Sequence, residues 1–221
     1  KNSICDWSNF EEDLMIIESG LKKNLHVAHP LAVCNNFDDP SLQKKAAQIW
    51  ANDKYPHDNS LGPIKKYPKT KKIRIGYFSG DFSEHPVGFI VANLFERHDK
   101  NKFELFGFSL VKKIQSKTRS RIKNSCDEFF DVENYTDKEI ALLARDKKID
   151  IAIDLGGYTK HGRPAIFALR AAPIQISYLG YPGTTGVNYI DYNIADKFII
   201  PKAAQQYFTE KIIYLPECYQ P

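Results

Sequence analysis

The chain from residue 71 onward alternates between short stretches rich in β-branched and aromatic residues and stretches with apolar residues at helical spacing. This alternation constrains the fold more than any other feature of the sequence. Parallel strands joined by helices need right-handed crossovers, and the helices then cover both faces of the sheet. The sequence therefore predicts an α/β fold with a Rossmann-like, mostly parallel sheet. The expected strands are 72–78, 103–109, 128–132, 149–154, 173–179, 192–195 and 211–215, and the expected helices are 86–98, 115–124, 136–147, 162–169 and 202–207.

Two stretches before residue 55 have the spacing of amphipathic helices, residues 6–24 and residues 41–52. Their apolar residues are Phe10, Leu14, Ile17 and Leu21 in the first stretch and Leu42, Ala46, Ile49 and Trp50 in the second. We interpret these stripes as packing surface, because helical stripes of this kind are usually core. Two short helices cannot bury such faces by themselves, so we expect them to pack on the α/β region. The residues expected at that interface are Trp7, Leu14, Ile17, Ile49 and Trp50.

The composition bounds the domain organisation. With 221 residues, of which 43% are hydrophobic, the chain can bury one domain core and an appendage. Residues 55–70 are rich in proline and lysine and are interpreted as a linker. The expected organisation is therefore a helical segment at 1–54, a linker at 55–70 and a Rossmann-like region at 71–221.

Charge, hydropathy and cysteine usage exclude several classes of function. The net charge is only +4, and the lysines lack interleaved aromatic residues, so nucleic-acid binding is not expected. No apolar run approaches the roughly 20 residues that span a bilayer, and no signal-peptide pattern opens the chain, so no membrane partner is expected. The four cysteines are far apart without a CxxC pair, which argues against a zinc site or a disulfide framework. We therefore expect a cytoplasmic protein with reduced thiols.

Residues 73–86, IRIGYFSGDFSEHP, run from an apolar strand into a polar loop. Gly80 ends the strand, and Pro86 suits the first turn of a following helix. His85 is therefore expected at the carboxyl end of a strand and beside a helix N-terminus, where open α/β sheets bind ligands. Side chains that could cap the helix are Asp81, Ser83 and Glu84. The alternative is that His85 is an ordinary solvated loop histidine.

Two later loops, residues 154–159 and 179–186, also follow β-rich stretches and contain glycines that let backbone approach a ligand. Three strand-end loops of similar polarity predict one shared rim. His161 is a further candidate for this rim, whereas Asp154 is open to interpretation as a structural cap. The tyrosines of these loops, Tyr158 and Tyr181, have packing of the rim as an equal alternative to sugar binding. The remaining histidines, interpreted as solvent-facing or capping residues, are His26, His29, His57 and His98.

Nucleotide motifs limit the reaction class. No G-x-G-x-x-G follows the first strand, and no Walker motif occurs anywhere, so dinucleotide binding and ATP hydrolysis are not supported. No Asp-x-Asp metal motif occurs either, and no cofactor or metal is expected.

Several segments in a fixed order resemble the O-linked N-acetylglucosamine transferase and SPINDLY family of glycosyltransferases. They are CDW at 5–7, RIGYFSGDFSEHPVG at 74–88, GGYTKHGRPAIFALRAAPIQISYLGYPGTTG at 156–186 and DY at 191–192. The resemblance covers nearly the whole chain. It implies a GT-B architecture, in which two Rossmann-like halves face each other across a cleft behind tetratricopeptide helices. The chain resembles the N-terminal, acceptor-side half and the last helices before it.

The resemblance also implies which residues carry the function. His85 matches the active-site histidine of the family's D-F-x-x-H-P motif, where it is a candidate base or an orienting group for the acceptor. The other positions that the resemblance places at the sugar and acceptor cleft are Asp81, Pro86, Gly157, Tyr158, Thr159, Tyr181, Pro182, Gly183 and Thr184. Residues 140–149, where some animal members carry a second cleft histidine, hold Arg145 and Asp146 instead.

The implied activity is transfer of a sugar to Ser or Thr of protein or peptide acceptors, with UDP-GlcNAc as the expected donor. GDP-fucose is an alternative donor, because SPINDLY-type relatives share these motifs. A protein-binding scaffold without chemistry is the alternative from a different class. The nucleotide sugar would be bound mainly by a C-terminal half beyond this chain, so the 221 residues alone are expected to be inactive.

Overall fold

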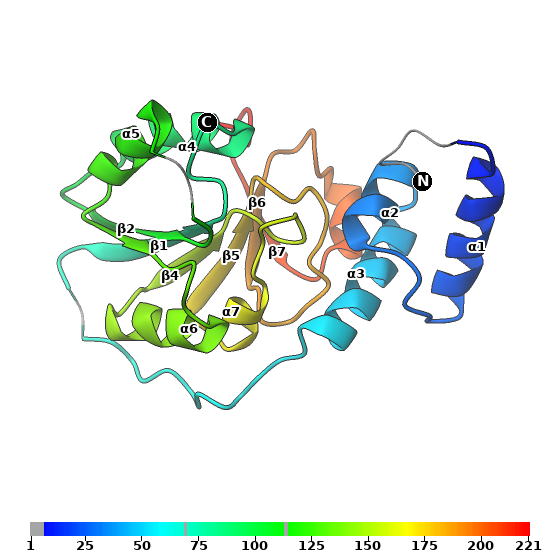
Figure 1. The fold of residues 1–221 in the computed structure, drawn as a ribbon, viewed down its shortest axis with the longest axis horizontal. Helices are drawn as coiled ribbons and strands as arrows, with labels where there is room; N and C mark the ends of the chain where they lie inside the picture. The colour runs from blue at the N-terminus through cyan, green and yellow to red at the C-terminus, as the bar shows by residue number, and fades with distance from the viewer. Residues whose placement is uncertain (1–6, 69, 113–114) are drawn as a thin grey trace.

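The computed structural model describes residues 7–68, 70–112 and 115–221, so the expectations for Cys5 and Asp6 lie outside the described residues. Its centre is a seven-stranded sheet in the order β3-β2-β1-β4-β5-β6-β7 (Figure 1), and every neighbouring pair is parallel. The strands are β1 (Ile73–Ser79), β2 (Phe103–Ser109), β3 (Glu128–Asp131), β4 (Ile151–Asp154), β5 (Ile174–Tyr178), β6 (Tyr192–Ala195) and β7 (Lys211–Tyr214). The predicted parallel sheet is confirmed, with each strand overlapping its expected range.

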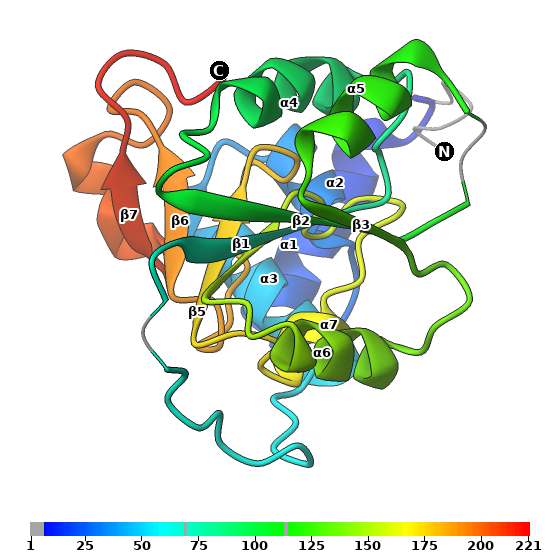
Figure 2. The same cartoon turned by 90° about the vertical axis from the view of Figure 1, so that its left-hand side faces the viewer.

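Helices cover both faces of the sheet, as predicted. Figure 2 shows α4 (Pro86–Arg97) and α5 (Lys117–Ser125) on one face and α6 (Asp137–Asp146) and α7 (Ala165–Ala168) on the other. Because the strands are covered twice, alternate side chains enter two separate cores. Phe95 of α4 packs with Ile75 and Tyr77 in one core. In the other, the Phe78 and Phe108 rings stack with centroids 4.3 Å apart, and Phe167 of α7 meets Phe78 edge-on.

Two of the expected helices differ from their predicted form. The stretch expected at 162–169 forms only the single turn of α7, because residues before Ala165 remain in the loop after β4. The stretch at 202–207 is a 3₁₀ helix, η2 (Lys202–Tyr207), rather than an α-helix. None of its six residues is buried, so no packing rewards the longer α-helical hydrogen-bonding pattern.

Three helices precede the sheet: α1 (Phe10–Lys22), α2 (Pro30–Asn36) and α3 (Pro40–Lys54). The sequence does not predict α2, which is only seven residues long. It begins at Pro30 in the first helical position, and the His29 ring accepts a hydrogen bond from the Leu31 backbone N–H at 3.2 Å. His29 is therefore a capping residue, as expected, although the helix that it caps was not predicted.

Helix α3 lies between α1 and the sheet region and has two buried faces. Leu42 and Ala46 pack with Leu21 and Val33 among the three helices. Ala47 and Ala51 belong to the core of the α/β region instead. Trp50 packs against that core as predicted. The prediction that α1 also reaches it is wrong: Trp7 is exposed, and Ile17 and Ile49 pack within the helical cluster, because α1 lies on α3 rather than on the sheet.

Residues 55–72, as far as they are described, contain no helix or strand and run along the side of α6 and α7 (Figure 1). The Asp58 backbone N–H donates to the Ala168 carbonyl at 3.0 Å. Arg145 donates from Nη1 to the carbonyls of Leu61 and Gly62 at 2.9 and 3.0 Å. Arg145, noted in the sequence where some relatives carry a cleft histidine, therefore holds this segment at the end of α6.

The structure offers no helix, over the residues that it describes, with the length and apolar character needed to cross a membrane.

A capping box opens α6 at Thr136 and Glu139. The Glu139 backbone N–H donates to Thr136 Oγ1 at 3.2 Å, and the Thr136 N–H donates to Glu139 Oε2 at 2.7 Å. Replacing Thr136 by alanine removes the cap, and we expect the free energy of unfolding to fall by about 1 kcal/mol in urea titration. The exposed neighbour Lys138→Ala is the control and should stay within about 0.5 kcal/mol of wild type. Equal losses in both variants would contradict a role for the cap.

Candidate functional site

Three loops meet at the carboxyl edge of the sheet around the point where the strand order reverses. β1 lies between β2 and β4, and β4 is followed by β5, so the loops after β1, β4 and β5 are neighbours. Such a reversal is where open α/β sheets bind ligands. The structure thus brings together the three loops that the sequence singled out.

Glycines allow these loops to approach closely. A Cβ added at Gly80 would clash with the side chain of His161, which joins the first loop to the second. A Cβ at Gly157, where φ is +52°, would lie 2.6 Å from Cβ of Tyr181, which joins the second loop to the third. At Gly180 it would clash with the carbonyl oxygen of Leu155. The rim is therefore one packed unit of three loops.

His85 is the N-cap residue of α4, with Pro86 as the first helical residue. Its Nδ1 accepts a hydrogen bond from the Val87 backbone N–H at 3.3 Å. The cap is thus His85 itself, and the expectation that Asp81, Ser83 or Glu84 would cap α4 is wrong. Only His85 occupies the N-cap position, where its extended backbone places the ring against the first turn of α4.

The hydrogen bond at Nδ1 assigns the tautomer of the neutral ring. A nitrogen that accepts cannot carry a proton, so the proton lies on Nε2. Asp81 Oδ2 is 3.9 Å from Nδ1 and would attract the ring only in its charged form. Nε2 has no hydrogen-bond partner within the described part of the chain, and the side chain is 43% exposed. His85 therefore presents an N–H donor to the rim.

The Asp154 side chain binds the backbone of the second loop. Its Oδ1 accepts hydrogen bonds from the backbone N–H groups of Gly156 and Gly157 at 2.9 and 3.0 Å. Burial raises the pKa of this carboxyl, and the two N–H donors lower it. The geometry is that of the structural cap that the sequence left open.

Several of the expected cleft residues have buried side chains. The Tyr158 hydroxyl donates to the Thr185 carbonyl at 2.6 Å, and the Tyr181 hydroxyl lies 3.6 Å from Cys34 Sγ of α2. Thr184 Oγ1 donates to Glu210 Oε2 at 2.6 Å. The Tyr158 hydroxyl thus joins the second loop to the third, the Tyr181 hydroxyl lies against α2 and the Thr184 hydroxyl is bonded to Glu210, so all three hydroxyls have partners within the protein.

Other expected residues lie closer to solvent. Thr159, His85 and the additional candidate His161 are half-buried, and Pro182 is exposed. Pro86 is exposed at the start of α4, whereas Gly183 and Asp81 are buried. Of the residues expected at the rim, His85, Pro86, Thr159, His161 and Pro182 are therefore at least partly accessible to solvent.

Glu210 is a buried acid that the sequence analysis did not single out. Its Oε1 accepts hydrogen bonds from the Thr185 backbone N–H, at 2.6 Å, and from the Thr185 hydroxyl. Together with the bond from Thr184, the carboxylate fixes the C-terminal end of the third loop, at residues 184–185. Its partners Thr184 and Thr185 lie 26 and 25 residues earlier in the chain, and no local motif links them.

Replacing Glu210 by alanine should lower the free energy of unfolding by about 1–3 kcal/mol, because the Thr184 hydroxyl and the Thr185 N–H lose their acceptor. Glu210→Gln keeps one carbonyl acceptor and should recover part of the loss. Urea titration of both variants measures this. The exposed acid Glu217→Ala is the control, and a similar small effect in all three variants would contradict the role of Glu210.

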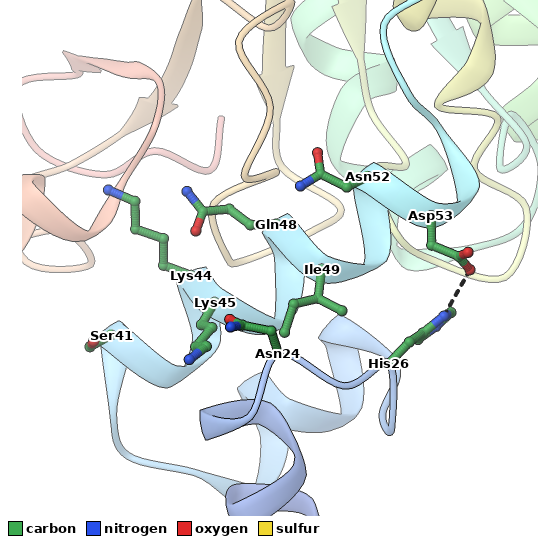
Figure 3. Close-up of a pocket in the computed structure, with 9 residues that line it drawn as sticks. All are labelled: Asn24, His26, Ser41, Lys44, Lys45, Gln48, Ile49, Asn52 and Asp53. Carbon is green, nitrogen blue, oxygen red and sulfur yellow. Dashed lines mark ion pairs between the residues drawn. The ribbon is translucent and has the colours of Figure 1, made fainter.

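A surface hollow of about 740 Å³ lies along α3 (Figure 3). Its polar groups are used to tie the helices together: Lys45 Nζ donates to the Lys22 carbonyl at 2.9 Å, and His26 pairs with Asp53 at 2.8 Å. It is lined by Asn24, His26, Ser41, Lys44, Lys45, Gln48, Ile49, Asn52 and Asp53. It shares no residue with the three loops.

Over the residues that the structure describes, no group of three or more His, Cys, Asp or Glu is placed to hold a metal ion.

Comparison with known proteins identifies the family. Residues 4–220 match the family described as Glycosyl transferase family 41. The chain belongs to glycosyl transferase family 41. The predicted resemblance is thereby confirmed, because the match covers nearly every residue, including the segments that carry all three loops.

Relatives within glycosyl transferase family 41 support the assignment. The chain is 40% identical, over 98% of its length, to 24% of a probable UDP-N-acetylglucosamine–peptide N-acetylglucosaminyltransferase SEC of Arabidopsis thaliana. It is 30% identical, over 98% of its length, to 20% of a UDP-N-acetylglucosamine–peptide N-acetylglucosaminyltransferase of Caenorhabditis elegans. It is 34% identical, over 67% of its length, to 17% of a probable enzyme of the same description, SPINDLY, of Arabidopsis thaliana.

A solved structure from the same family has a similar fold. A mutant O-GlcNAc transferase of Thermobaculum terrenum superposes with a TM-score of 0.76 at 27% identity, over 93% of this chain and 42% of that one. The parallel sheet with helices on both faces is therefore the Rossmann-like half of a GT-B fold. The chain spans 24% or less of the length of the three curated relatives above.

Proposed function

We propose that this chain is the acceptor-side half of the catalytic region of a protein O-glycosyltransferase. The donor is UDP-GlcNAc, and the acceptors are Ser or Thr hydroxyls of proteins or peptides. The observation that carries the proposal is the match to family 41 over residues 4–220, together with His85 at the rim where the strand order reverses. The relatives from Arabidopsis thaliana and Caenorhabditis elegans, described as UDP-N-acetylglucosamine–peptide N-acetylglucosaminyltransferases, support the same donor and acceptor.

The chemistry needs a hydroxyl held against the anomeric carbon of the sugar. The bond from the acceptor oxygen to that carbon forms while the bond to the nucleotide diphosphate breaks, the hydroxyl proton passes to the departing diphosphate, and correct placement supplies much of the rate. His85 offers an Nε2–H donor, because Nδ1 is occupied by the Val87 N–H. We therefore assign to His85 the orienting role rather than that of base: its N–H holds the acceptor oxygen in place. Acting as base at Nε2 would require a proton at Nδ1 and the loss of the helix cap.

The other rim residues are proposed to shape the cleft. The backbone of Gly157 and Gly183 would let the sugar or acceptor approach, and Thr159 and Pro182 would contact it. Asp81, Pro86, Tyr158, Tyr181 and Thr184 are proposed to act by fixing the loops. The nucleotide diphosphate would be bound mainly by a second Rossmann-like half, which is proposed to lie in the remainder of the protein.

The finer organisation is proposed in the same way. α1 to α3 would be the last helices of a tetratricopeptide-type region or linker helices, joined through residues 55–70 to the Rossmann-like region. The exposed apolar residues Met15 and Ile16 on α1 support a further packing partner there. We propose a cytoplasmic location, which agrees with the unpaired state of Cys34, Cys126 and Cys218.

Incubation of the full-length protein with protein acceptors and a nucleotide sugar tests the proposal. Intact-mass analysis should find the gain of an N-acetylhexosamine with UDP-GlcNAc. A gain of a deoxyhexose with GDP-fucose would reassign the donor. No gain with either donor, in a protein that still captures the same acceptors, would replace the enzyme with a binding scaffold.

A further inference from the structure

The first turn of α5 contacts the loop that carries His85. Glu84, the residue immediately before His85, accepts two hydrogen bonds from Thr118: from its backbone N–H at 3.1 Å and from its hydroxyl at 3.0 Å. Glu84 thus places its carboxylate at the N-terminus of α5, where the helix dipole favours negative charge. The hydrogen bond from the Thr118 backbone is the main cause that holds the pKa of Glu84 below its usual value.

The next residue of α5 contacts the same loop from the inside. Arg119 is buried, and its Nη1 donates to the Phe82 carbonyl at 3.3 Å and to Ser109 Oγ at 3.1 Å. Its Nη2 pairs with Asp131 at the end of β3. Because Ser109 and Asp131 end two strands of the sheet, Arg119 connects a rigid frame to the loop.

The loop between these two contacts has little freedom. The Ser83 N–H donates to the Asp81 carbonyl, and the His85 N–H donates to the Ser83 carbonyl, both at 2.8 Å. Gly88 of α4 lies so close that an added Cβ would clash with the Ser83 carbonyl. The position of His85 is therefore set from both ends: by α4, which it caps, and by α5, which holds residues 82 and 84.

We infer that Glu84 and Arg119 are positioning residues for His85, and that the bond between Glu84 and Thr118 sets the distance of the imidazole from the acceptor. The inference rests on the proposed function. Glu84 is exposed, so its bonds to Thr118 contribute little to global stability and their value lies in the geometry of the loop. Displacement of a catalytic group by about 1 Å costs up to about 100-fold in rate.

The test compares Glu84→Ala with the conservative variant Glu84→Gln and with a control variant, all in the full-length enzyme. Glu84→Ala should lower kcat about 10-fold, with an unchanged KM for the donor and a nearly unchanged melting temperature. Glu84→Gln retains an acceptor for the Thr118 N–H and should recover most of the activity. The control is Glu96→Ala, which removes the other exposed pair between α4 and α5, Glu96 with Arg121 at 2.8 Å, and should leave kcat unchanged.

A double variant separates positioning from structure. If Glu84 acts through His85, Glu84→Ala should cause no further loss in a His85→Asn background, because the two effects are coupled. Wild-type kcat in Glu84→Ala, or the same 10-fold loss in the His85→Asn background, would overturn the inference. Wild-type activity of His85→Asn alone would instead overturn the role proposed for His85, so the two failures are distinguishable.

Discussion

Replacing His85 by alanine in the full-length enzyme lowers kcat by about 100-fold or more, while the melting temperature changes little. The side chain is 43% exposed and leaves no cavity in the core when it is removed. Loss of the group that orients the acceptor oxygen should cost about 10²-fold, because a misplacement of about 1 Å costs that much. Initial rates with a peptide acceptor and UDP-GlcNAc, with thermal unfolding measured on the same samples, check this.

The matched variant His85→Asn separates the helix cap from the chemistry. Asparagine caps helices well, so it should preserve the start of α4 that His85 now caps through Val87. It lacks the imidazole and should remain about as slow as His85→Ala. Full activity in His85→Asn would mean that His85 serves only as a cap, and full activity in both variants would make it an ordinary loop residue.

Removing residues 1–54 from the 221-residue chain should be the most destabilising change considered. The deletion uncovers the face against which Ala47, Ala51, Trp50 and Leu31 pack. Full burial of a large apolar side chain contributes about 1.5–3 kcal/mol, so loss of the partly buried Trp50 and Leu31 amounts to at most about 3–6 kcal/mol. At roughly 2–4 °C per kcal/mol for a chain of this size, the melting temperature should fall by about 10 °C.

Removal of residues 1–28 is the control, because it deletes α1 alone and stops before the His29 cap of α2. α1 packs on α3 and not on the sheet, so this shorter deletion should have a clearly smaller effect. Thermal unfolding followed by circular dichroism compares the three chains. If the longer deletion left the melting temperature unchanged, the helices would be an independent tail.

The central strands could be predicted because they are buried on both faces. Segments such as Phe103–Ser109 then read as nearly continuous apolar runs, and their regular separation by helices leaves few topologies. α2 was missed because seven residues between a proline and a turn have no visible period. The second face of α3 was missed for a related reason: Ala47 and Ala51 are small, so hydropathy does not mark them as buried, and Ala47 lies in close contact with Gly186.

The candidate site could be predicted only where chemistry is local. His85 next to Pro86 predicts a group at a helix N-terminus, and the glycines predict close approach. The partner of Glu84 lies 34 residues away and the partners of Glu210 lie 25 and 26 residues away, so no local spacing connects them. Glu84 was expected to cap α4, but the geometry gives that place to His85 and directs Glu84 to α5.

The glycine contacts between the three loops have a consequence for how such enzymes can diverge. At Gly80, Gly157 and Gly180 even one added methyl group would collide with the next loop. The shape of the rim should therefore be inherited unchanged while sequences drift apart. New acceptor preferences would have to arise from outward-facing side chains, such as Thr159 and Pro182, or from the helices in front of the rim. Different acceptor preferences could then arise while the backbone of the three loops stays nearly unchanged.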